Sequence, residues 1–283
     1  MYRSAITSRT HFSSQEYLLN AKHSSLDMGL PLGVFAYSSF GVRGSLALRT
    51  LRDNEASQPD EIIKLPPYQN VNAPLGVALR ARRSVRQMSG NTMALQTLST
   101  ILFYADGVTG EFTLASDDAD LLPKHALGET FVGQHRTAPS GGGLNPIYLY
   151  LAIQNVEKLQ DGIYMYMPTN HSLRRISIFN EKTKQEFLSL GPDWGMNIEI
   201  KTVNISIFYV YYLFDNTRKY GDMGLMFGLI ETGQIAQNIH LICTALKIAS
   251  TDIGGWNKVP SETLLGVDGL SKHLIHLTLV GMA

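Results

Sequence analysis

The chain has 283 residues, of which 44% are hydrophobic and 17% charged, a balance typical of a globular protein with a sizeable core. Its 24 basic and 24 acidic residues cancel, so charge gives no reason to expect a nucleic acid or an anionic membrane as partner. The single cysteine, Cys243, excludes an intramolecular disulfide framework. No apolar run of signal-peptide length opens the sequence, and 28–36 is short and contains Pro31, so we expect a cytoplasmic protein without a membrane span.

The first 75 residues show the weakest pattern in the chain. Ser, Asn, Gln and Asp are frequent there, apolar periodicity is weak, and Pro66-Pro67 forms a stiff connector near the end of the stretch. From Ala73 onward the sequence patterns become clearer. We therefore expect an N-terminal extension over 1–75, to which the sequence assigns no role, and a main domain over 76–283.

The main domain opens with a helix and continues with strands. Apolar residues at three- and four-residue steps predict an amphipathic helix over 93–106, which Gly107 ends, and 115–135 is predicted to be a surface loop. An exposed helix is predicted over 181–190. Strands are predicted over 147–153, 162–167, 173–178, 203–214 and 273–281, the second and third as a hairpin. Because no regular strand–helix–strand repeat is present, the fold class is α+β.

The longest apolar run covers 224–249 and is hydrophobic around nearly the whole circumference of a helix. Such a helix lies in a core or spans a membrane, and Glu231 and Gln234 belong to a set of polar residues that interrupt it too often for lipid. We therefore expect a buried central helix, with Asp222 as its N-cap and Lys247 near its C-terminal end. One chain of this size offers such a helix little cover, which favours a homodimer.

Two short motifs suit a flat, phosphorylated ligand. Arg82, Ser84 and Arg86 alternate, so in an extended loop their side chains point to one side and can hold a phosphate; a solvated basic turn is the alternative. Residues 139–143 read Pro-Ser-Gly-Gly-Gly, whose backbone a planar ligand can approach closely; a flexible loop is the alternative. No GxGxxG fingerprint or P-loop is present.

Metal chemistry and serine-hydrolase chemistry find no support in the sequence. The eight histidines are scattered, and the chain has no HExxH pair, no paired cysteines and no GxSxG elbow. His273 and His276 lie three residues apart in a predicted strand, so they face opposite sides and are expected to be structural or surface residues. We predict no metal site.

Five motifs occur in a specific order along residues 75–283. They are Arg-Arg-Ser-Val-Arg at 82–86, Arg-Thr-Ala-Pro-Ser-Gly-Gly-Gly-Leu-Asn-Pro at 136–146, Lys-Tyr-Gly-Asp at 219–222, Glu-Thr-Gly-Gln-Ile-Ala-Gln-Asn at 231–238 and Ile-Gly-Gly at 253–255. Together they resemble the nitroreductase superfamily. Within it they resemble the FMN-dependent azoline dehydrogenases of thiazole- and oxazole-modified peptide pathways, the streptolysin- and microcin-type oxidases.

The resemblance implies a fold, a cofactor and an assembly. The fold would be a central mixed or antiparallel sheet flanked by helices, in an obligate homodimer that binds FMN between its subunits. Gln237 and Asn238 would lie near the site or the dimer interface. The implied FMN-binding residues are Arg82, Ser84 and Arg86 at the phosphate, Pro139, Ser140, Gly141 and Gly142 against one side of the ring, and Ile253, Gly254 and Gly255 near flavin N5 on the other side.

The resemblance also implies a reaction, the oxidation of azoline rings to azoles in a ribosomally made peptide, with a cyclodehydratase of the same pathway as partner. Lys219 and Tyr220 would be the catalytic pair, with Lys219 as the base and Tyr220 either hydrogen-bonding the substrate or sharing the proton. A free lysine, with a pKa of about 10.4, is mostly protonated at neutral pH. We therefore expect burial beside the apolar helix to lower the pKa of Lys219; an ordinary surface lysine is the alternative.

Two departures from the family pattern keep other functions open. The branch more often carries Arg-Gly-Tyr-Arg after Lys-Tyr-Gly-Asp, where this chain has Met-Gly-Leu-Met at 223–226. The basic residue that often follows the last strand is missing, and Lys272 is the nearest one. The alternatives are a nitroreductase or quinone reductase that uses NAD(P)H, and a non-catalytic flavin-binding or flavin-free scaffold of a biosynthetic complex. The sequence assigns no particular peptide, ring type or electron acceptor.

Overall fold

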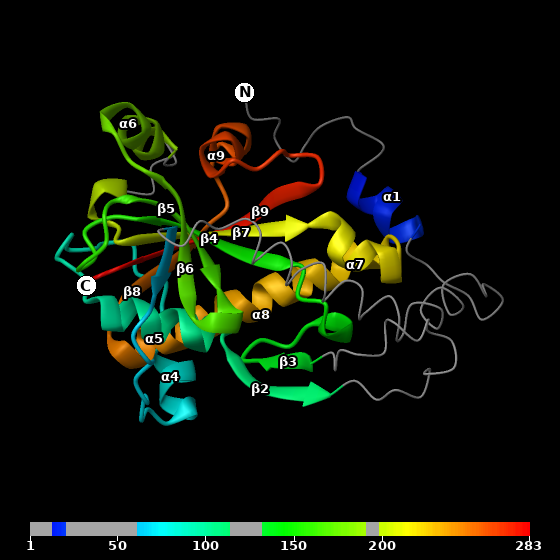
Figure 1. Ribbon diagram of the computed structural model, residues 1–283, viewed down its shortest axis with the longest axis horizontal. Coiled ribbons are helices and arrows are strands. Elements are labelled where there is room, and N and C mark those ends of the chain that lie inside the picture. The colour runs from blue at the N-terminus through cyan, green and yellow to red at the C-terminus, as the bar shows by residue number, and fades with distance from the viewer. Residues whose placement is uncertain (1–12, 21–60, 114–131, 191–197) are drawn as a thin grey trace.

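The computed structural model describes residues 13–20, 61–113, 132–190 and 198–283. Its helices are α1 (Ser13–Asn20), α4 (Leu75–Ala81), α5 (Leu95–Asp106), α6 (Glu181–Ser189), α7 (Leu213–Tyr220), α8 (Met223–Leu246) and α9 (Lys258–Leu265). A large sheet lies in the middle of the molecule, with α6 and α9 on one side and α5 and α8 on the other (Figure 1). The architecture is therefore three-layered.

The central sheet has seven strands in the order β1-β6-β5-β4-β7-β9-β8, and every neighbouring pair is antiparallel. Its middle strands β4 and β7 are buried along their whole length, which explains why their apolar residues run continuously rather than alternating. The strands are β1 (Ile62–Lys64), β4 (Ile147–Ile153), β5 (Gly162–Met167), β6 (Ser172–Ile178), β7 (Ile205–Tyr212), β8 (Ala249–Ile253) and β9 (Lys272–Gly281). A separate hairpin joins β2 (Val108–Thr113) to β3 (Val132–Arg136).

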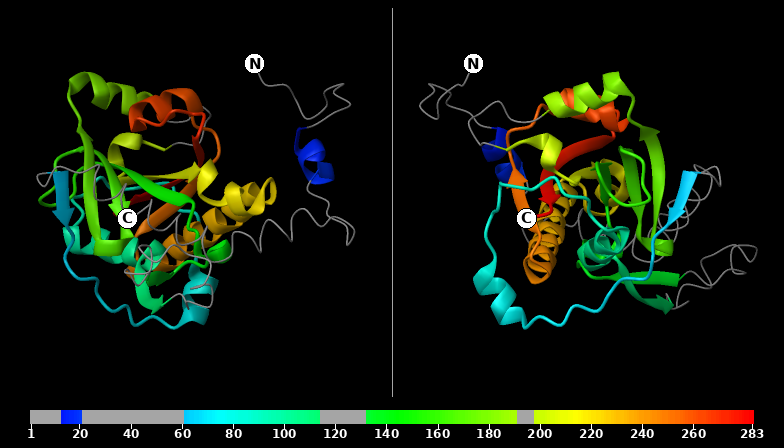
Figure 2. Two further views of the ribbon diagram at one scale, coloured as in Figure 1. Left: turned by 45° about the vertical axis from the view of Figure 1, so that its right-hand side comes forward. Right: turned by 90° about the vertical axis from the view of Figure 1, so that its left-hand side faces the viewer.

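Each face of the sheet has its own hydrophobic core, and the helices of the two cores lie on opposite sides of the sheet in both views of Figure 2. Leu98 of α5 and Ile239 of α8 are fully buried on one face, and Phe187 of α6 and Leu265 of α9 are buried on the other. Burying a side chain of this size stabilises the fold by roughly 1.5–3 kcal/mol. This burial fixes the helices to the sheet and thereby fixes the ends of the loops that connect them.

The predicted central helix is confirmed as α8, with two differences. The helix ends at Leu246, and Ala249, which the apolar run includes, begins β8 because Lys247 adopts a left-handed conformation with φ 57° and turns the chain back. Within one chain the helix is also not buried on every side, since Leu229 and Ile230 are each 50% exposed. An apolar flank of α8 therefore faces outward.

The strands predicted at 147–153, 162–167, 173–178, 203–214 and 273–281 are confirmed as β4, β5, β6, β7 and β9, and the helices at 93–106 and 181–190 as α5 and α6. The predicted loop at 115–135 is wrong at its end, where 132–135 belong to β3; its residues 115–131 lie outside the described part. The sequence patterns did not predict α4, α7, β8, α9 or the β2–β3 hairpin. The resemblance implied either a mixed or an antiparallel central sheet, and the observed sheet is wholly antiparallel.

Candidate active site

The glycine-rich turn at 139–143 has a well-defined shape. Gly142 and Gly143 have φ of 65° and 66°, a conformation that other residues rarely adopt. At the base of the turn, the Ser140 Oγ accepts a hydrogen bond from the Asn145 N–H at 2.8 Å, and the Asn145 side-chain amide donates to the Gly143 carbonyl at 2.8 Å. Gly141, on the outer side, is exposed. The turn thus offers a braced backbone surface to an approaching ligand.

Lys219 and Tyr220 end α7 and meet this turn. A β-carbon built on Gly142 would lie 2.9 Å from the Lys219 Nζ and would overlap the Tyr220 hydroxyl, so only glycine lets both side chains come this close. The Lys219 Nζ lies 5.2 Å from the centroid of the Tyr220 ring, and that ring stands edge-on to Phe227 at 4.9 Å. A β-carbon on Gly141 would lie 3.5 Å from Phe227. The two predicted catalytic residues and part of the predicted ring-binding turn therefore form one cluster.

The two ionisable groups of this cluster have shifted pKa values. Partial burial lowers the pKa of Lys219, in the direction expected from the sequence. The same cause raises the pKa of Tyr220, because water stabilises the charged form of either group. At neutral pH, Lys219 is therefore neutral more often than a free lysine, and Tyr220 keeps its proton.

Arg82, Ser84 and Arg86 lie in an extended segment along the sheet edge formed by β8. The Val85 N–H donates to the Ser250 carbonyl at 2.9 Å, which attaches the segment to that edge. Ser84 and Arg86 are exposed, and Arg82 is half-buried. Across the described ranges, no acidic side chain pairs with either arginine. Two guanidinium groups without acidic partners are suited to bind an anion.

The glycine turn and the basic segment lie at opposite ends of α8. Gly141 faces Phe227 near the start of the helix, whereas α4, which leads into the basic segment, forms a groove with Leu241 and Ala245 near its end. Phe227 and Leu241 are 14 residues apart, about 21 Å at a rise of 1.5 Å per residue. The five-carbon ribityl chain between the phosphate and the ring of FMN is too short for that span. Within one chain, the glycine turn and the basic segment therefore lie toward opposite ends of α8 rather than side by side.

The Ile253-Gly254-Gly255 turn follows β8. Ile253 is buried and pairs with Leu277 of β9, while Gly254 is exposed. A β-carbon built on Gly254 would have no atom within 4 Å, and its φ lies outside the left-handed region. Neither packing against the described residues nor backbone strain requires a glycine there, so this part of the structure leaves the position open to close approach by another molecule.

Asp252, directly before this turn, joins two histidines. Its carboxylate accepts hydrogen bonds from His240 at 2.9 Å, from His276 at 3.2 Å and from the Thr278 hydroxyl at 2.6 Å. Burial alone would raise the pKa of Asp252, but these hydrogen bonds outweigh it and hold the pKa well below its usual range. The His240 Nδ1 also lies 2.9 Å from the Ser250 Oγ. The network therefore ties α8 to the strand that carries the basic segment.

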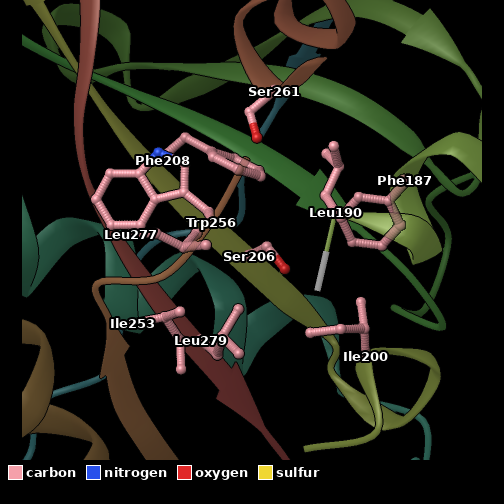
Figure 3. Close-up of a pocket in the computed structure, with 10 residues that line it drawn as sticks. All are labelled: Phe187, Leu190, Ile200, Ser206, Phe208, Ile253, Trp256, Ser261, Leu277 and Leu279. Atoms are coloured by element: carbon pink, nitrogen blue, oxygen red, sulfur yellow. The ribbon is translucent and has the colours of Figure 1, made fainter. Parts of the chain in front are cut away.

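An apolar pocket lies behind the 253–255 turn, between the sheet and the helices α6 and α9 (Figure 3). Its cavity volume is only about 10 Å³, roughly room for one water molecule, and Ile253, Trp256 and Phe208 contribute to its wall. The Ser206 Oγ points into it and has no hydrogen-bond partner within the described part of the chain. None of the described residues that line the pocket has an ionisable side chain.

Two other residues singled out in the sequence, Lys272 and Asn238, make contacts that hold parts of the fold together. Lys272 lies 4.9 Å from the ring centroid of Tyr212, a contact that engages it with the sheet rather than with the basic segment. The Asn238 amide donates to the Ala105 and Thr137 carbonyls, both at 3.3 Å, and so ties α8 to α5. Within the described residues, no group of three or more His, Cys, Asp or Glu side chains is placed to hold a metal ion. The contact of Phe227 with the turn and the Asp252 network carried no local sequence signal.

The nitroreductase family model matches residues 79–282. A protein of Methanocaldococcus jannaschii that bears the name nitroreductase is 31% identical over 194 residues, which cover 69% of this chain and 84% of that protein. The chain belongs to the nitroreductase family. Its α+β fold, with a large antiparallel sheet flanked by helices, is the nitroreductase fold, and its chemistry is that of a flavin-dependent oxidoreductase.

Two solved structures share the fold of this nitroreductase-family chain. A nitroreductase of Ralstonia eutropha JMP134 is 22% identical with a TM-score of 0.58, over 79% of this chain and 90% of that one. A chain of the E. coli microcin synthetase McbBCD complex, solved with truncated pro-MccB17 bound, is 19% identical with a TM-score of 0.55, over 97% of this chain and 98% of that one. At these identities the likeness shows the fold alone.

Among the described helices of the nitroreductase-family chain, none is long and apolar enough to cross a bilayer.

Proposed function

We propose that this nitroreductase-family protein uses FMN to oxidise azoline rings to azoles in a peptide. The observation that carries the proposal is the contact of Lys219 and Tyr220 with the glycine turn at Gly142. Transfer of electrons from a nicotinamide to a quinone needs no protein base, whereas oxidation of an azoline does. A partly buried lysine with a lowered pKa, placed at a turn suited to a flat ring, supplies such a base.

The residues present fit FMN. A phosphate needs charge-assisted hydrogen bonds, and Arg82 and Arg86 are arginines without acidic partners in the described chain, with the Ser84 hydroxyl between them. A planar ring needs a backbone surface that it can approach closely; Gly254 has no described atom within 4 Å of a built β-carbon, and exposed Gly141 offers backbone next to the Phe227 ring. Pro139, Ser140, Gly142, Ile253 and Gly255 complete the proposed cofactor-binding set.

The proposed mechanism assigns the proton to this chain. An azoline becomes an azole by losing a proton from one ring carbon, and a hydrogen with its electron pair from the neighbouring carbon. Bound FMN supplies the acceptor for that second hydrogen and electron pair. The neutral amine of Lys219 takes the proton, because burial keeps a larger share of the amine uncharged. Tyr220 keeps its own proton and donates a hydrogen bond to the substrate, while Phe227 holds the Tyr220 ring from one edge.

The proposed active unit is a homodimer with two composite sites. The basic segment of one chain and the glycine turn of the other would share one FMN, because these parts are too far apart along α8 to do so within a chain. Leu229 and Ile230 on α8 and Leu75 on α4 are exposed apolar side chains that a second copy would cover. Gly233, exposed in α8 with no atom within 4 Å of a built β-carbon, would let two helices approach closely.

The proposed substrate class is a peptide with azoline rings, and the proposed partner is a cyclodehydratase that forms those rings. The support is the fold shared with a chain of the microcin synthetase complex over nearly the full length of both proteins. That complex was solved with a truncated pro-peptide bound. The order of the sequence motifs points to the same branch of the family.

The test is mass spectrometry of a peptide that a cyclodehydratase has cyclised, incubated with the FMN-loaded protein in air. We expect each oxidised ring to lose two hydrogens. If the FMN-loaded protein leaves thiazoline and oxazoline peptides unchanged over many hours, the proposal is wrong. The protein without FMN serves as the control.

A second candidate is a reductase of nitroaromatics or quinones that uses NAD(P)H. The observation that favours it is the name nitroreductase carried by the relative with 31% identity. In the same preparation, rapid oxidation of NADH or NADPH that depends on an added quinone, together with unchanged azoline peptides, would support this candidate over the first.

A further inference from the structure

The hydroxyl of Tyr17 is inserted into the first turn of α8. Tyr17 belongs to α1, 205 positions before Asp222, and Figure 1 shows α1 beside α7. Its hydroxyl donates to the Asp222 carbonyl at 2.8 Å and accepts from the Met226 N–H at 3.1 Å. In a regular helix these two backbone groups bond to each other. A side chain of the N-terminal extension thus replaces the first backbone hydrogen bond of the helix.

This insertion clamps the corner that carries the proposed catalytic pair. Gly221 joins α7 to α8, directly after Lys219 and Tyr220. The Asp222 side chain makes no capping hydrogen bond, and the Met226 N–H, which in a regular helix bonds to the Asp222 carbonyl, bonds to the Tyr17 hydroxyl instead. The position of the corner therefore depends on a residue far away in the sequence.

Asn216 holds the same corner from the protein interior. Its side-chain amide donates to the Gly224 carbonyl at 2.7 Å, and its carbonyl oxygen accepts from the Tyr211 hydroxyl at 2.7 Å. Asn216 is buried, whereas Tyr17 is half-buried at the outer side. The corner is thus held from two sides, and the outer hold consists of one hydroxyl group.

We infer that Tyr17 is a positioning residue of the active site, which orients Lys219 and Tyr220 against the glycine turn by fixing the first turn of α8. The inference rests on the proposed role of Lys219 as the base. It assigns a part in the site to the N-terminal extension. Without the hydroxyl, the Met226 N–H returns to the Asp222 carbonyl, the corner moves, and water reaches Lys219.

The surroundings of Lys219 decide which measurement reports on this movement. Charged groups on the neighbouring elements are Asp215 and Arg218 on α7, Asp222 directly before α8, Glu231 on α8, and Glu16 on α1. The cause that lowers the pKa of Lys219 is burial, not any one of these charges. A loosened corner therefore raises the pKa of Lys219 toward the value of a free lysine.

The experiment compares the wild-type protein with Tyr17→Phe, which removes only the hydroxyl, and with Tyr68→Phe as a control on a tyrosine stacked on Phe103. Two quantities are measured across a range of pH. The first is the rate at which an amine-specific acylating reagent modifies Lys219, read by peptide mapping. The second is kcat for ring oxidation. FMN content, melting temperature and dimer mass verify that each variant is folded.

For Tyr17→Phe we expect unchanged FMN content, a labelling midpoint of Lys219 at higher pH, and kcat lower by about 10- to 100-fold because a small misplacement of a catalytic group is costly. Tyr68→Phe should match the wild type. If Tyr17→Phe keeps both the labelling midpoint and kcat of the wild type, the inference is wrong. If no protein oxidises azolines but the labelling midpoint still moves in Tyr17→Phe, the proposed function fails while the positioning role stands.

Discussion

The ionisable side chains near the two ends of α8 differ in their burial and in their contacts. At the first end, Lys219 and Tyr220 are partly buried, lie in contact with a glycine turn and have shifted pKa values. At the other end, Arg86 is exposed and Arg82 half-buried beside the edge strand, without acidic partners in the described chain. The first arrangement suits the movement of a proton, and the second suits the holding of an anion. Since a long helix separates them, the proposed complete site would take one end from each of two copies.

The largest expected effect is at the first end. Lys219→Ala should keep FMN and the dimer but lower the rate of azole formation by roughly 10²–10⁴-fold, as removal of a general base does. In the wild type the rate should rise with pH as Lys219 loses its proton, because the neutral amine is the active form. The measurement is two-hydrogen loss per ring by mass spectrometry.

The control for this variant is Lys182→Ala, which removes a lysine whose side chain is 84% exposed on α6. It should behave as the wild type. A Lys219→Ala protein that forms azoles at the wild-type rate would remove Lys219 from the role of base.

The second-largest expected effect is in the basic segment, near the C-terminal end of α8. Arg82→Ala should weaken FMN binding by about 10- to 100-fold, equivalent to one charge-assisted hydrogen bond of about 1.5–3 kcal/mol. Fluorescence titration with FMN measures this, with Lys201→Ala on an exposed lysine as the control.

Co-expression of Arg82→Ala and Lys219→Ala chains then tests whether the ends of different chains share a site. The assay uses an FMN concentration that fills wild-type sites but leaves Arg82→Ala sites mostly empty, so that neither homodimer is active. If the ends are shared, half of the dimers are mixed, each mixed dimer has one intact site, and activity returns to about a quarter of the wild-type level. If both ends of one chain serve the same site, the mixed sample gains no activity, and the composite dimer is wrong.

A smaller effect tests whether a second copy of the chain packs on α8 between its two ends. In solvent, Gly233→Ala should stabilise the helix by about 1 kcal/mol, since glycine is a poor helix former. If a second copy packs there, the added methyl group should instead weaken the dimer, which sedimentation at decreasing concentration detects. Gln185→Ala on exposed α6 is the control. A Gly233→Ala dimer as tight as the wild type would exclude close helix packing at this position.

The smallest expected effect concerns Asp252 and pH. Its pKa is lower in the folded protein than in the unfolded chain, so its contribution to stability is present above a pH of about 4, the value of a free aspartate, and is lost as the pH falls below that. Thermal unfolding between pH 6 and pH 3 should therefore lose less stability in Asp252→Asn than in the wild type. Glu157→Gln, at an exposed loop position, should follow the wild type. Equal losses in Asp252→Asn and the wild type would contradict the assignment.

Long periodic elements were predictable from the sequence, and contacts between distant segments were not. The runs that became α5, α8, β4 and β7 are strongly apolar, so local pattern sufficed. α7 was missed because its residues continue the apolar strand β7 at first and then turn polar, which hides the boundary. β8 was missed because its apolar start reads as the end of the helix, and only the left-handed Lys247 separates the two.

The candidate site shows the same division. The cluster of Gly142, Lys219 and Tyr220 joins motifs that the resemblance had already singled out, so its members could be named from the sequence. Tyr17 could not, because a lone tyrosine in a weakly patterned stretch carries no sign of the helix that it will meet. The Asp252 network likewise depends on the register of β8 against β9, which brings Thr278 opposite Asp252.

The only cysteine of the sequence, Cys243, is fully buried in α8, and burial raises its pKa to about 12. Almost none of it is thiolate near neutral pH, and the thiolate is the form that reacts with maleimides. The folded protein with its native sequence therefore does not react with thiol-directed dyes near neutral pH. A cysteine introduced at an exposed position can be labelled alone, and a pair of fluorophores on two copies would report their spacing in solution without the removal of any native residue.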